Sequence, residues 1–328
     1  MEIREVAWQD ADAVRRTAEL KEAVRAFEEP WAHPVTPGRV EADLRHGWDG
    51  EPSVGLLVTV DGVDVATAEY ETTSYDNQHL AWLGIDVHPD HRRRGHGSAV
   101  LELLLDRART DGKTTVGIDS WESPGPRVFA EGHGFEQKMI SVNRRQYLAK
   151  VDRAELDRLH DDALSHATDY ELVRRVGSTP ADELAALARM TEAINDAPID
   201  NLDIEDEAFP PERVAAYEAA QASRGDLLLR VYARHRETGE LAGQTVVAVE
   251  GGRPWIAHQH DSSVVRAYRG RRLGVLLKTD MLRWLAEAQP QVETVDTWNA
   301  ESNGHMIGVN EAMGYEILAR AVAFQRSI

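Results

Sequence analysis

The sequence contains no cysteine among its 328 residues. Disulfide frameworks, thiolate nucleophiles and cysteine-based zinc sites are therefore excluded. Long apolar runs are also missing, so the sequence predicts no membrane-spanning helix. The first residues, MEIREVAWQD, are charged and lack the apolar core of a secretion signal. We therefore expect a cytoplasmic protein with no membrane partner.

Basic residues are in deficit, because 37 Lys and Arg stand against 56 Asp and Glu and the formal net charge is −19. Such a surface repels phosphate backbones, so we expect no nucleic acid partner. The charge would attract cationic small molecules, or it could serve only to keep the protein in solution. The length exceeds what one core usually organises and favours two domains.

One internal repeat dominates what the sequence does contain. HRRRGHG at His91–Gly97 aligns with YRGRRLG at Tyr268–Gly274 (268 − 91 = 177 and 274 − 97 = 177). The segments IDSWE and VDTWN, further along each half, keep the same offset. One repeat of this period indicates two domains of the same fold rather than a solenoid. We place the domains at residues 1–152 and 170–328, joined by a polar linker helix at 153–169.

Each repeat is predicted to hold a strand, a loop, an amphipathic helix and a second strand. The strands before the loops are LAWLGIDV and WIAHQHDSSVV, and apolar residues at helical spacing follow both loops. Strands joined by a crossover helix are parallel, whereas the turns Asp61-Gly62 and Thr238-Gly239 predict hairpins. The expected fold class is α+β: each domain has a mixed, mostly antiparallel central sheet with flanking helices and one parallel βαβ unit.

The loop between strand and helix is typical of an anion site. Unpaired N–H groups and the positive helix end point to it, glycine permits close approach, and arginine adds forked donors. Neither GxxxxGK[ST] nor GxGxxG is present. The second loop keeps Gly274 but has Arg272 where Gly95 falls in the first, so it resembles a damaged copy.

VHPDHRRRGHG, followed by an apolar helix, a strand and GHGF, resembles the GNAT superfamily of acetyl-CoA-dependent N-acetyltransferases. The R/Q-x-x-G-x-G/A motif of that superfamily matches Arg92, Gly95 and Gly97. VVRAYRGRRLG and NAESNGHMIGVNEAMGY extend the resemblance to the second half, so that it covers almost the whole chain. The duplicated layout is similar to that of the mycothiol synthase family, in which the first domain holds acetyl-CoA and the second is catalytic.

This resemblance implies acetyl-CoA as co-substrate, a small primary amine as acceptor and no metal. It leaves a homodimer open. In both halves the strand backbone would pair with the pantetheine arm and the loop would hold the pyrophosphate. The implied cofactor-binding residues are Ile85, Asp86, Val87, Arg92, Arg93, Arg94, Gly95, His96, Gly97, Ser98, Ser262, Ser263, Val264, Arg269, Gly270, Arg271, Arg272, Leu273, Gly274, Val275 and Asn303.

Titratable side chains distinguish the two halves. Side chains on a strand alternate between faces, and the alternate positions before Val264 include His258 and His260, whereas those before Val87 are apolar. Imidazoles suit a general base near neutral pH. The H-x-H spacing resembles the histidine pair of arylalkylamine N-acetyltransferases, which relays the amine proton. We therefore expect the C-terminal domain to be catalytic and the N-terminal domain to be a CoA-binding or structural copy.

Several alternatives stay open. The histidines could be a buried hydrogen-bonded pair, or metal ligands with Asp261, although residues 260 and 261 face opposite sides of a strand that has no bulge. The N-terminal domain could instead catalyse through ordered water, Asp86 or Glu71. The protein could also bind acyl-CoA, or a partner, without any chemistry.

Two further features concern the leaving group and the acceptor. Many GNAT enzymes protonate the departing thiolate with a tyrosine, where this chain has Asn310 and, in the first half, Ala130. Asn310 donates hydrogen bonds but no proton, so Ser302 or Asn303 could take over that role. The acidic segment NDAPIDNLDIEDEAFPPE could bind a cationic amine or form a solvated loop.

Overall fold

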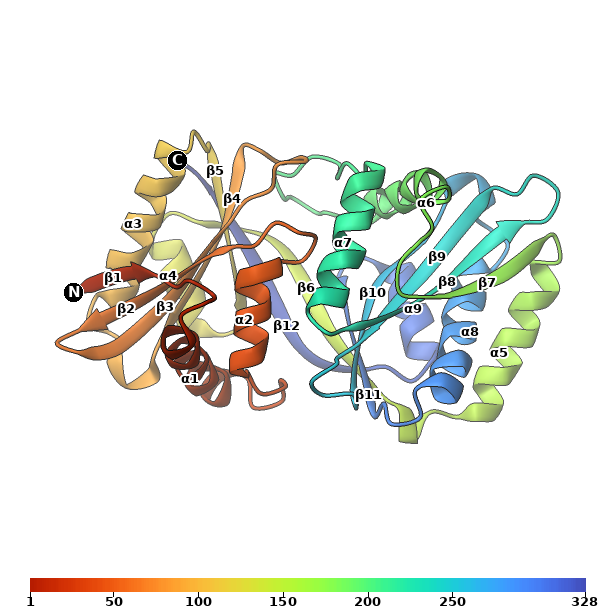
Figure 1. The fold of residues 1–328 in the computed structure, drawn as a ribbon, viewed down its shortest axis with the longest axis horizontal. Helices are drawn as coiled ribbons and strands as arrows, with labels where there is room; N and C mark the ends of the chain where they lie inside the picture. The colour runs from red at the N-terminus through yellow and green to blue at the C-terminus, as the bar shows by residue number, and fades with distance from the viewer. The chain divides into compact units, whose positions relative to one another are not determined.

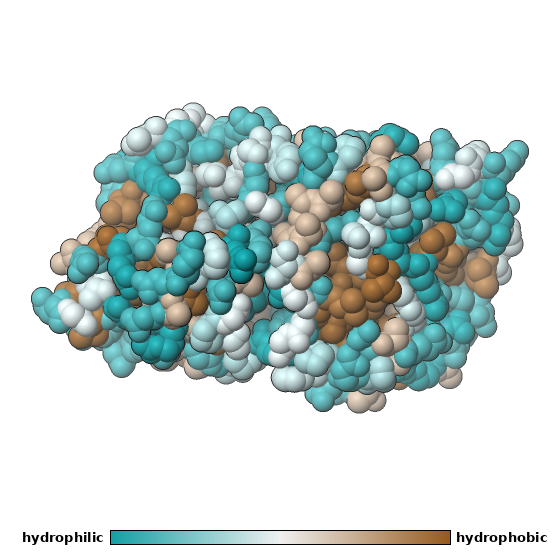
Figure 2. All heavy atoms as spheres, in the orientation of Figure 1, coloured by the Kyte–Doolittle hydropathy of each residue, from teal (hydrophilic) through white to brown (hydrophobic).

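The computed structural model describes residues 1–328 and divides them into two compact units. Unit 1 comprises Met1–Met139, Asn201–Glu205 and Ala321–Ile328, and unit 2 comprises Ile140–Asp200 and Asp206–Arg320. Figure 1 labels the helices and strands of both units. No helix combines the length and apolar character needed to cross a membrane. The visible face is mostly hydrophilic, with apolar atoms in separate patches (Figure 2).

Unit 1 is built on a sheet with the strand order β1-β2-β3-β4-β5-β12. Neighbouring strands pair antiparallel except β4 and β5, which are parallel. These strands span Glu2–Glu5 (β1), Val54–Val60 (β2), Val63–Glu71 (β3), Leu80–Val87 (β4), Thr115–Trp121 (β5) and Glu316–Ser327 (β12). Asp61 and Gly62 both adopt positive φ at the β2–β3 turn, as that hairpin requires.

Helices cover both faces of this sheet. The helices are α1 (Ala11–Glu28), α2 (Pro37–His46), α3 (His96–Thr110) and α4 (Pro124–Gly132). On α3 the predicted apolar stripe is buried in a core that includes Val100, Leu101, Leu104 and Leu105. A smaller cluster, which includes Val14 and Leu57, holds α1 and α2 against the other face. Strand β4 therefore has one face covered by α1 and the other covered by α3. These faces are called the α1 side and the α3 side below.

Unit 2 repeats this plan with the order β7-β8-β9-β10-β11-β6. Only β10 and β11 are parallel. Its strands span Tyr170–Val176 (β7), Leu227–His235 (β8), Leu241–Val249 (β9), Ile256–Val264 (β10), Thr294–Ala300 (β11) and Glu136–Tyr147 (β6). Its helices are α5 (Arg153–His166), α6 (Leu184–Thr191), α7 (Pro211–Ser223), α8 (Leu273–Ala288) and α9 (Gly304–Ala312). Short 3₁₀ turns complete the fold: η1 (Pro89–His91), η2 (Leu148–Lys150), η3 (Glu192–Asp196) and η4 (Arg266–Tyr268).

The expected α+β class, with one parallel βαβ unit in each half, is confirmed, but the units do not follow the expected ranges. The last strand, β12, pairs with β5 and completes unit 1. Strand β6, which lies much earlier in the chain, pairs with β11 and completes unit 2. The exchange gives each sheet a final antiparallel strand, so that neither β5 nor β11 is left with an unpaired edge.

The segment expected to be a linker is a packed helix of unit 2. Helix α5 places Leu156 and Ala163 in the same core as the apolar residues of α8. His160 on α5 also lies 2.7 Å, Nδ1 to Nη1, from Arg283 on α8. The sequence predicted the helix but not its packing, because only one of its faces is apolar.

Candidate active site

In both units the two parallel strands separate partway along. Strands β10 and β11 pair only over Ile256–His258 and Thr294–Asp296, although β10 continues to Val264. Strands β4 and β5 likewise stop pairing at Leu83 and Ile118, while β4 continues to Val87. Past the pairing, the strand edge has N–H and C=O groups free of that ladder, and such groups need partners. The positions predicted to bind pantetheine, residues 85–87 and 262–264, lie in these two gaps.

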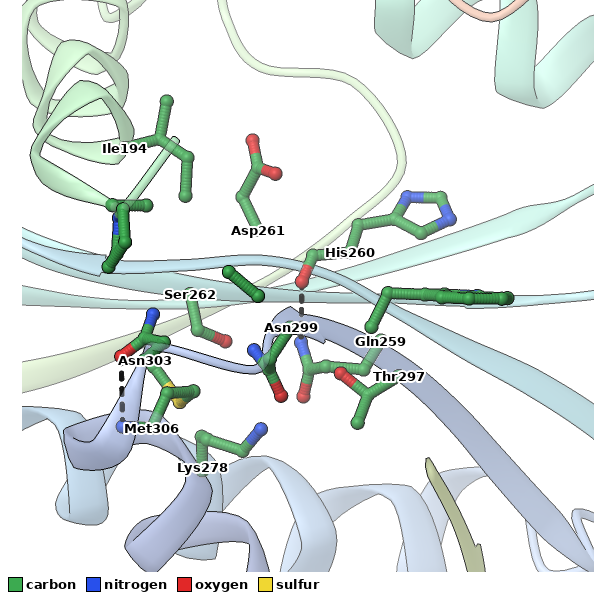
Figure 3. Close-up of a pocket in the computed structure, with 14 residues that line it drawn as sticks. Ile194, Gln259, His260, Asp261, Ser262, Lys278, Thr297, Asn299, Asn303 and Met306 are labelled. Carbon is green, nitrogen blue, oxygen red and sulfur yellow. Dashed lines mark hydrogen bonds between the residues drawn. The ribbon is translucent and has the colours of Figure 1, made fainter. Parts of the chain in front are cut away.

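Strand β10 contains a β-bulge that β4 lacks. Gln259 faces Val247 on β9 and Ser262 faces Thr245, so three steps on β10 oppose two on β9. In unit 1, β3 and β4 pair without any register shift. A bulge interrupts the alternation of side chains, and Figure 3 shows the effect. His260 and Asp261 lie on one side of β10, whereas Gln259 and Ser262 lie on the other. In a regular strand, Ser262 and His260 would lie on the same face. The bulge places them on opposite faces.

A cavity of about 170 Å³ opens at this bulge. Its lining comes from β10, β11, α8, α9 and the segment around η3, all within unit 2. Figure 3 shows these side chains reaching the cavity from both sides of β10. The lining residues are Ile194, Ala197, Pro198, Gln259, His260, Asp261, Ser262, Lys278, Thr297, Trp298, Asn299, Ala300, Asn303 and Met306.

The two histidines of the predicted pair have different surroundings. His260 lines the cavity, and its Nδ1 lies 2.6 Å from the hydroxyl oxygen of Tyr217 on α7. His258 is not part of the lining, and its Nε2 lies 2.7 Å from Oε1 of Glu250. Burial alone would raise the pKa of Glu250, but hydrogen bonds with His258 and Arg253 outweigh it and lower that pKa to about 2. Of the pair, only His260 is placed to meet a ligand in the cavity.

Asp261 joins His260 on the same side of the strand because of the bulge (Figure 3). Burial raises the pKa of this carboxyl, opposed by the charges of Arg230 and Arg213. Sequence reasoning treated Asp261 only as a metal ligand, since nothing in HQHDSS reveals where a strand bulges. The structure brings together no group of three or more histidine or acidic side chains that could hold a metal ion.

The other side of the cavity has a polar floor. Lys278 on α8 donates from Nζ to Oδ1 of Asn310, at 2.8 Å. Asn310 donates from Nδ2 to Oδ1 of Asn299, at 2.6 Å. Asn310 is fully buried and does not itself line the cavity. Its side-chain oxygen and nitrogen are both used to hold Lys278 and Asn299 in place. Lys278 escaped the sequence analysis because a single lysine within a helix carries no local signal.

The floor of unit 1 is apolar at the same positions. Subtracting the repeat offset from Lys278 gives Leu101 (278 − 177 = 101), and Ala130 occupies the place of Asn310. Both are buried in the core beneath β4. The two units therefore differ both at the strand and below it.

The two loops share one backbone. Two residues in each adopt left-handed φ angles: Arg93 (60°) and Gly95 (86°) in unit 1, and Gly270 (82°) and Arg272 (56°) in unit 2. These positions correspond (93 + 177 = 270 and 95 + 177 = 272). Glycine takes this conformation without steric cost and arginine does not. Each loop thus has one glycine and one arginine in the same two left-handed sites, in opposite order, and the second loop is not a degraded copy.

The first arginine of each loop braces the loop itself. Arg92 donates from Nε to the Val87 carbonyl at 2.9 Å and from Nη1 to Glu28 at 2.6 Å. Arg269 repeats this with the Val264 carbonyl at 2.9 Å and Asp196 at 2.6 Å. Both guanidinium groups are therefore engaged within the fold.

The remaining loop residues stand where a ligand phosphate could reach them. Arg272 forms an ion pair with Asp162 on α5, whereas Arg93, Arg94 and Arg271 are exposed. The predicted residues 96–98 and 273–275 form the first turns of α3 and α8, whose N–H groups have no partner within the helix. Asn303 instead caps α9, since its Oδ1 accepts from the Met306 N–H at 3.2 Å.

The carboxylates of the acidic segment do not gather around the cavity. Asp196 holds Arg266 and Arg269, Asp200 accepts from Ser302 Oγ at 2.6 Å, and Asp203 accepts from Thr115 Oγ1 at 2.8 Å. From this region, apolar Ile194, Ala197 and Pro198 reach the lining instead. Ser302 is thus engaged by Asp200 and is also absent from the lining.

Unit 1 has partly buried charged groups of its own on the α1 side of β4. Burial raises the pKa of Asp86, with Lys21 lowering it and Glu69 raising it. Lys21 itself donates to Glu69 at 2.6 Å. Just after α1, Trp31 packs edge-on against Trp121, the last residue of β5, with ring centroids 5.7 Å apart. These groups form the counterpart of the His260–Asp261 side in unit 2.

Two sheets, each with parted parallel strands and an arginine–glycine loop that starts a helix, define a protein with two acyltransferase-type units in tandem. Residues 20–135 match the Acetyltransferase (GNAT) family. Mycothiol acetyltransferase of Stackebrandtia nassauensis is 32% identical over 115 residues, which make up 34% of this chain and 36% of that protein. Mycothiol acetyltransferase of Parafrankia sp. is 26% identical over 196 residues, 59% of this chain and 57% of that protein.

The chain therefore spans about a third to a little over half of the length of these two curated relatives. One solved structure, a tandem GNAT protein from the clavulanic acid biosynthesis pathway, is 26% identical with a TM-score of 0.81, and the match covers 99% of this chain and 98% of that one. The whole chain thus has the layout of that tandem GNAT protein, and residues 20–135 match the GNAT acetyltransferase family itself, as the loop motifs implied.

Proposed function

We propose that the protein transfers the acetyl group of acetyl-CoA to the primary amine of a small molecule, and that unit 2 carries the chemistry. The observation that supports this most is the cavity at the β10 bulge, where His260 and Asp261 meet the gap between β10 and β11. Unit 1 has the strand gap and the loop but neither the bulge nor the polar floor. It would bind CoA or serve as a structural copy.

The residues present fit acetyl-CoA. The first turn of α8 offers N–H groups to the pyrophosphate, and exposed Arg271 adds charge. The backbone of residues 262–264 would pair with the pantetheine amides, which brings the thioester to the bulge. A cofactor held along this gap would present its acetyl carbon to the cavity.

The amine would arrive on the side of His260 and Asp261. The Asp261 carboxylate attracts an ammonium ion, and His260, held by Tyr217, accepts the proton that the amine must lose. The nitrogen lone pair then attacks the acetyl carbon, a C–N bond forms, and the C–S bond to CoA breaks. Holding amine and thioester together accounts for much of the rate gain in such reactions, and a positioned base typically adds about 10²- to 10⁴-fold.

The test compares the two units in one assay. Acetyl-CoA and a panel of primary amines, including mycothiol-related ones because of the names of the curated relatives, are screened for acetylated product by mass spectrometry. With an amine that is turned over, we expect Asp261→Asn and His260→Gln each to lower kcat by about 10²- to 10⁴-fold. His258→Gln is expected to cost less, because His258 lies outside the cavity.

Asp86→Asn tests the rival assignment to unit 1. A large loss of kcat in Asp86→Asn, with Asp261→Asn and His260→Gln unchanged, would transfer the chemistry to unit 1. Glu102→Gln, an exposed change on α3, controls for non-specific effects of removing a charge. Tight acetyl-CoA binding with no product from any amine would instead favour a binding protein without chemistry.

A further inference from the structure

Lys278 is a buried lysine whose partner is an amide rather than a carboxylate. Its exposed fraction is 2%. One of its N–H bonds goes to Asn310 Oδ1 at 2.8 Å, and its Nζ lies 5.2 Å from the ring centroid of Tyr315. A lysine ammonium has three donors, so the others remain available toward the cavity that this residue lines. Buried charges are usually paired, and this one is not.

Packing alone does not call for a lysine at this position. The corresponding residue of unit 1, Leu101, is fully buried in an apolar core, and Ala130 stands where unit 2 has Asn310. The same fold is therefore built without the lysine and without its amide partner. In unit 2 the pair comes with a further amide, Asn299, which continues the hydrogen-bond chain to the cavity wall.

The position of Lys278 relative to β10 is informative. Figure 3 shows Lys278 on the opposite side of the strand from His260 and Asp261, together with Asn299, Gln259 and Ser262. That is the side on which α8 begins and on which the body of acetyl-CoA would run. A thioester held in the strand gap would have the attacking amine on one side and its sulfur on the Lys278 side.

We propose that Lys278 is the acid that protonates the sulfur of CoA as it leaves. This rests on the proposed function, because it assumes acetyl transfer in the unit 2 cavity. When the tetrahedral intermediate collapses, the C–S electron pair goes to sulfur, which takes a proton from the Lys278 ammonium and leaves as the free thiol. The amide product forms, Lys278 is left neutral, and solvent restores its proton. Asn310 and Asn299 position the ammonium and are not themselves acids.

The protonation state of Lys278 suits this role. Burial lowers the pKa of Lys278 to about 7, so the group can both give and regain a proton near neutral pH. The groups that face it are the Tyr315 ring, Asn310 on α9, Thr297 and Asn299 on β11 and Gln259 on β10, with His260 and Asp261 across the strand. The nearby Asp296 carboxylate is held by Arg145 at 2.6 Å. Because the acid must be protonated, its contribution to the rate falls as pH rises above about 7.

The test uses the dependence of the rate on the leaving group. Lys278→Leu installs the unit 1 residue, and Lys278→Arg keeps the charge on a group too basic to release its proton. With acetyl-CoA we expect kcat to fall by about 10²- to 10³-fold in both variants. With the acetyl thioester of thionitrobenzoic acid, whose thiolate leaves without protonation, the loss should shrink to less than about 5-fold, since no acid is needed.

The controls separate this proposal from the function on which it rests. His260→Gln should be impaired with both donors, because the amine proton must leave in either case. If His260→Gln and Asp261→Asn are fully active, the proposed function fails. If these two are impaired but Lys278→Leu loses equal activity with both donors, Lys278 is only structural and the acid role is overturned. Acetylated Lys278 in the wild-type protein, detected by mass spectrometry as a turnover intermediate, would also overturn it. Leu101→Met, a volume-conserving change in unit 1, should leave both rates unchanged.

Discussion

Units 1 and 2 have the same loop backbone and differ in the polar groups around the strand that feeds it. Their loops place residues 93 and 95, or 270 and 272, in the same left-handed conformations, and both are braced by an arginine bonded to the strand-end carbonyl. Strand β4 is regular and lies over Leu101 and Ala130, whereas β10 is bulged and lies over Lys278 and Asn310. The regularity of the loop motif therefore says little about which copy is active.

The difference is what a division of roles between the two units, as proposed above, would require. A loop that holds a pyrophosphate depends mostly on backbone N–H groups, so it tolerates exchange of glycine and arginine between two positions. Proton transfer depends on a few side chains held within hydrogen-bond reach of the reacting atoms. One extra residue in β10 and the buried pair Lys278 and Asn310 distinguish unit 2 from unit 1 in this respect.

The largest effect is expected from removing the bulge. Deletion of His260 gives β10 the residue count of a regular strand, while His260→Gly removes the imidazole and keeps the extra residue. We expect kcat/KM to fall more than about 10⁴-fold in the deletion and about 10²- to 10³-fold in the substitution, because the deletion also draws Asp261 into the place that His260 leaves, so that both side chains are lost from their present positions at the cavity. Steady-state kinetics measures both, and circular dichroism checks the fold. Equal losses in the two variants would show that the bulge contributes nothing beyond His260.

The next effect concerns a pair of equivalent aspartates on β11 and β5. Asp296 binds Arg145 of β6 through two hydrogen bonds of 2.6 and 2.7 Å, both side chains being buried. Its counterpart Asp119 faces Ala323 of β12. Part of Asp119 is exposed to solvent. Neighbouring atoms nevertheless desolvate its carboxyl group, which raises the pKa of Asp119 to about 6.

We expect Arg145→Met to lower the free energy of unfolding of unit 2 by about 3–5 kcal/mol, since it leaves a buried carboxylate uncompensated. Asp119→Asn should leave unit 1 unchanged or slightly more stable at pH 7, because that carboxylate is already held in an unfavourable environment. Urea unfolding, followed separately for each unit by hydrogen exchange, measures both values. Similar losses for the two variants would contradict the contrast between the strands.

The smallest effect concerns the exchanged glycines. No atom lies within 4 Å of a Cβ built on Gly95 or on Gly270, so an alanine at either position meets only the cost of positive φ. We expect Gly95→Ala and Gly270→Ala each to destabilise by about 1–2 kcal/mol. Arg93→Gly should recover part of that in unit 1, whereas Arg272→Gly gains less because it also removes the ion pair with Asp162. Thermal unfolding of the four variants gives the order, and a larger loss for one glycine would show that the loops are not equivalent.

The sequence was a sound guide to the repeat and the fold. Alternation and helical spacing predicted β4, β10 and the helices after them, and the crossover predicted which strands are parallel. The exchange of β6 and β12 could not be predicted, because either strand has the pattern to complete either sheet. Of the residues that line the candidate cavity, His260 was proposed from its residue type, while Asp261 was assigned to the opposite face because regular alternation was assumed. Lys278 was missed because its burial depends on residues far away in the chain.

By itself, the sequence determined that the chain holds two copies of one βαβ unit, each with an arginine–glycine loop, because those properties follow from local periodicity and from glycine and arginine at fixed spacing. Only the tertiary structure decided which copy gathers a polar cavity. The bulge is set by how β10 pairs with β9, and the state of Lys278 is set by the helix and strands that bury it. Pairing and burial depend on residues far apart in the chain. A local motif can therefore indicate where a cofactor would bind, but it cannot indicate which side chains would transfer a proton.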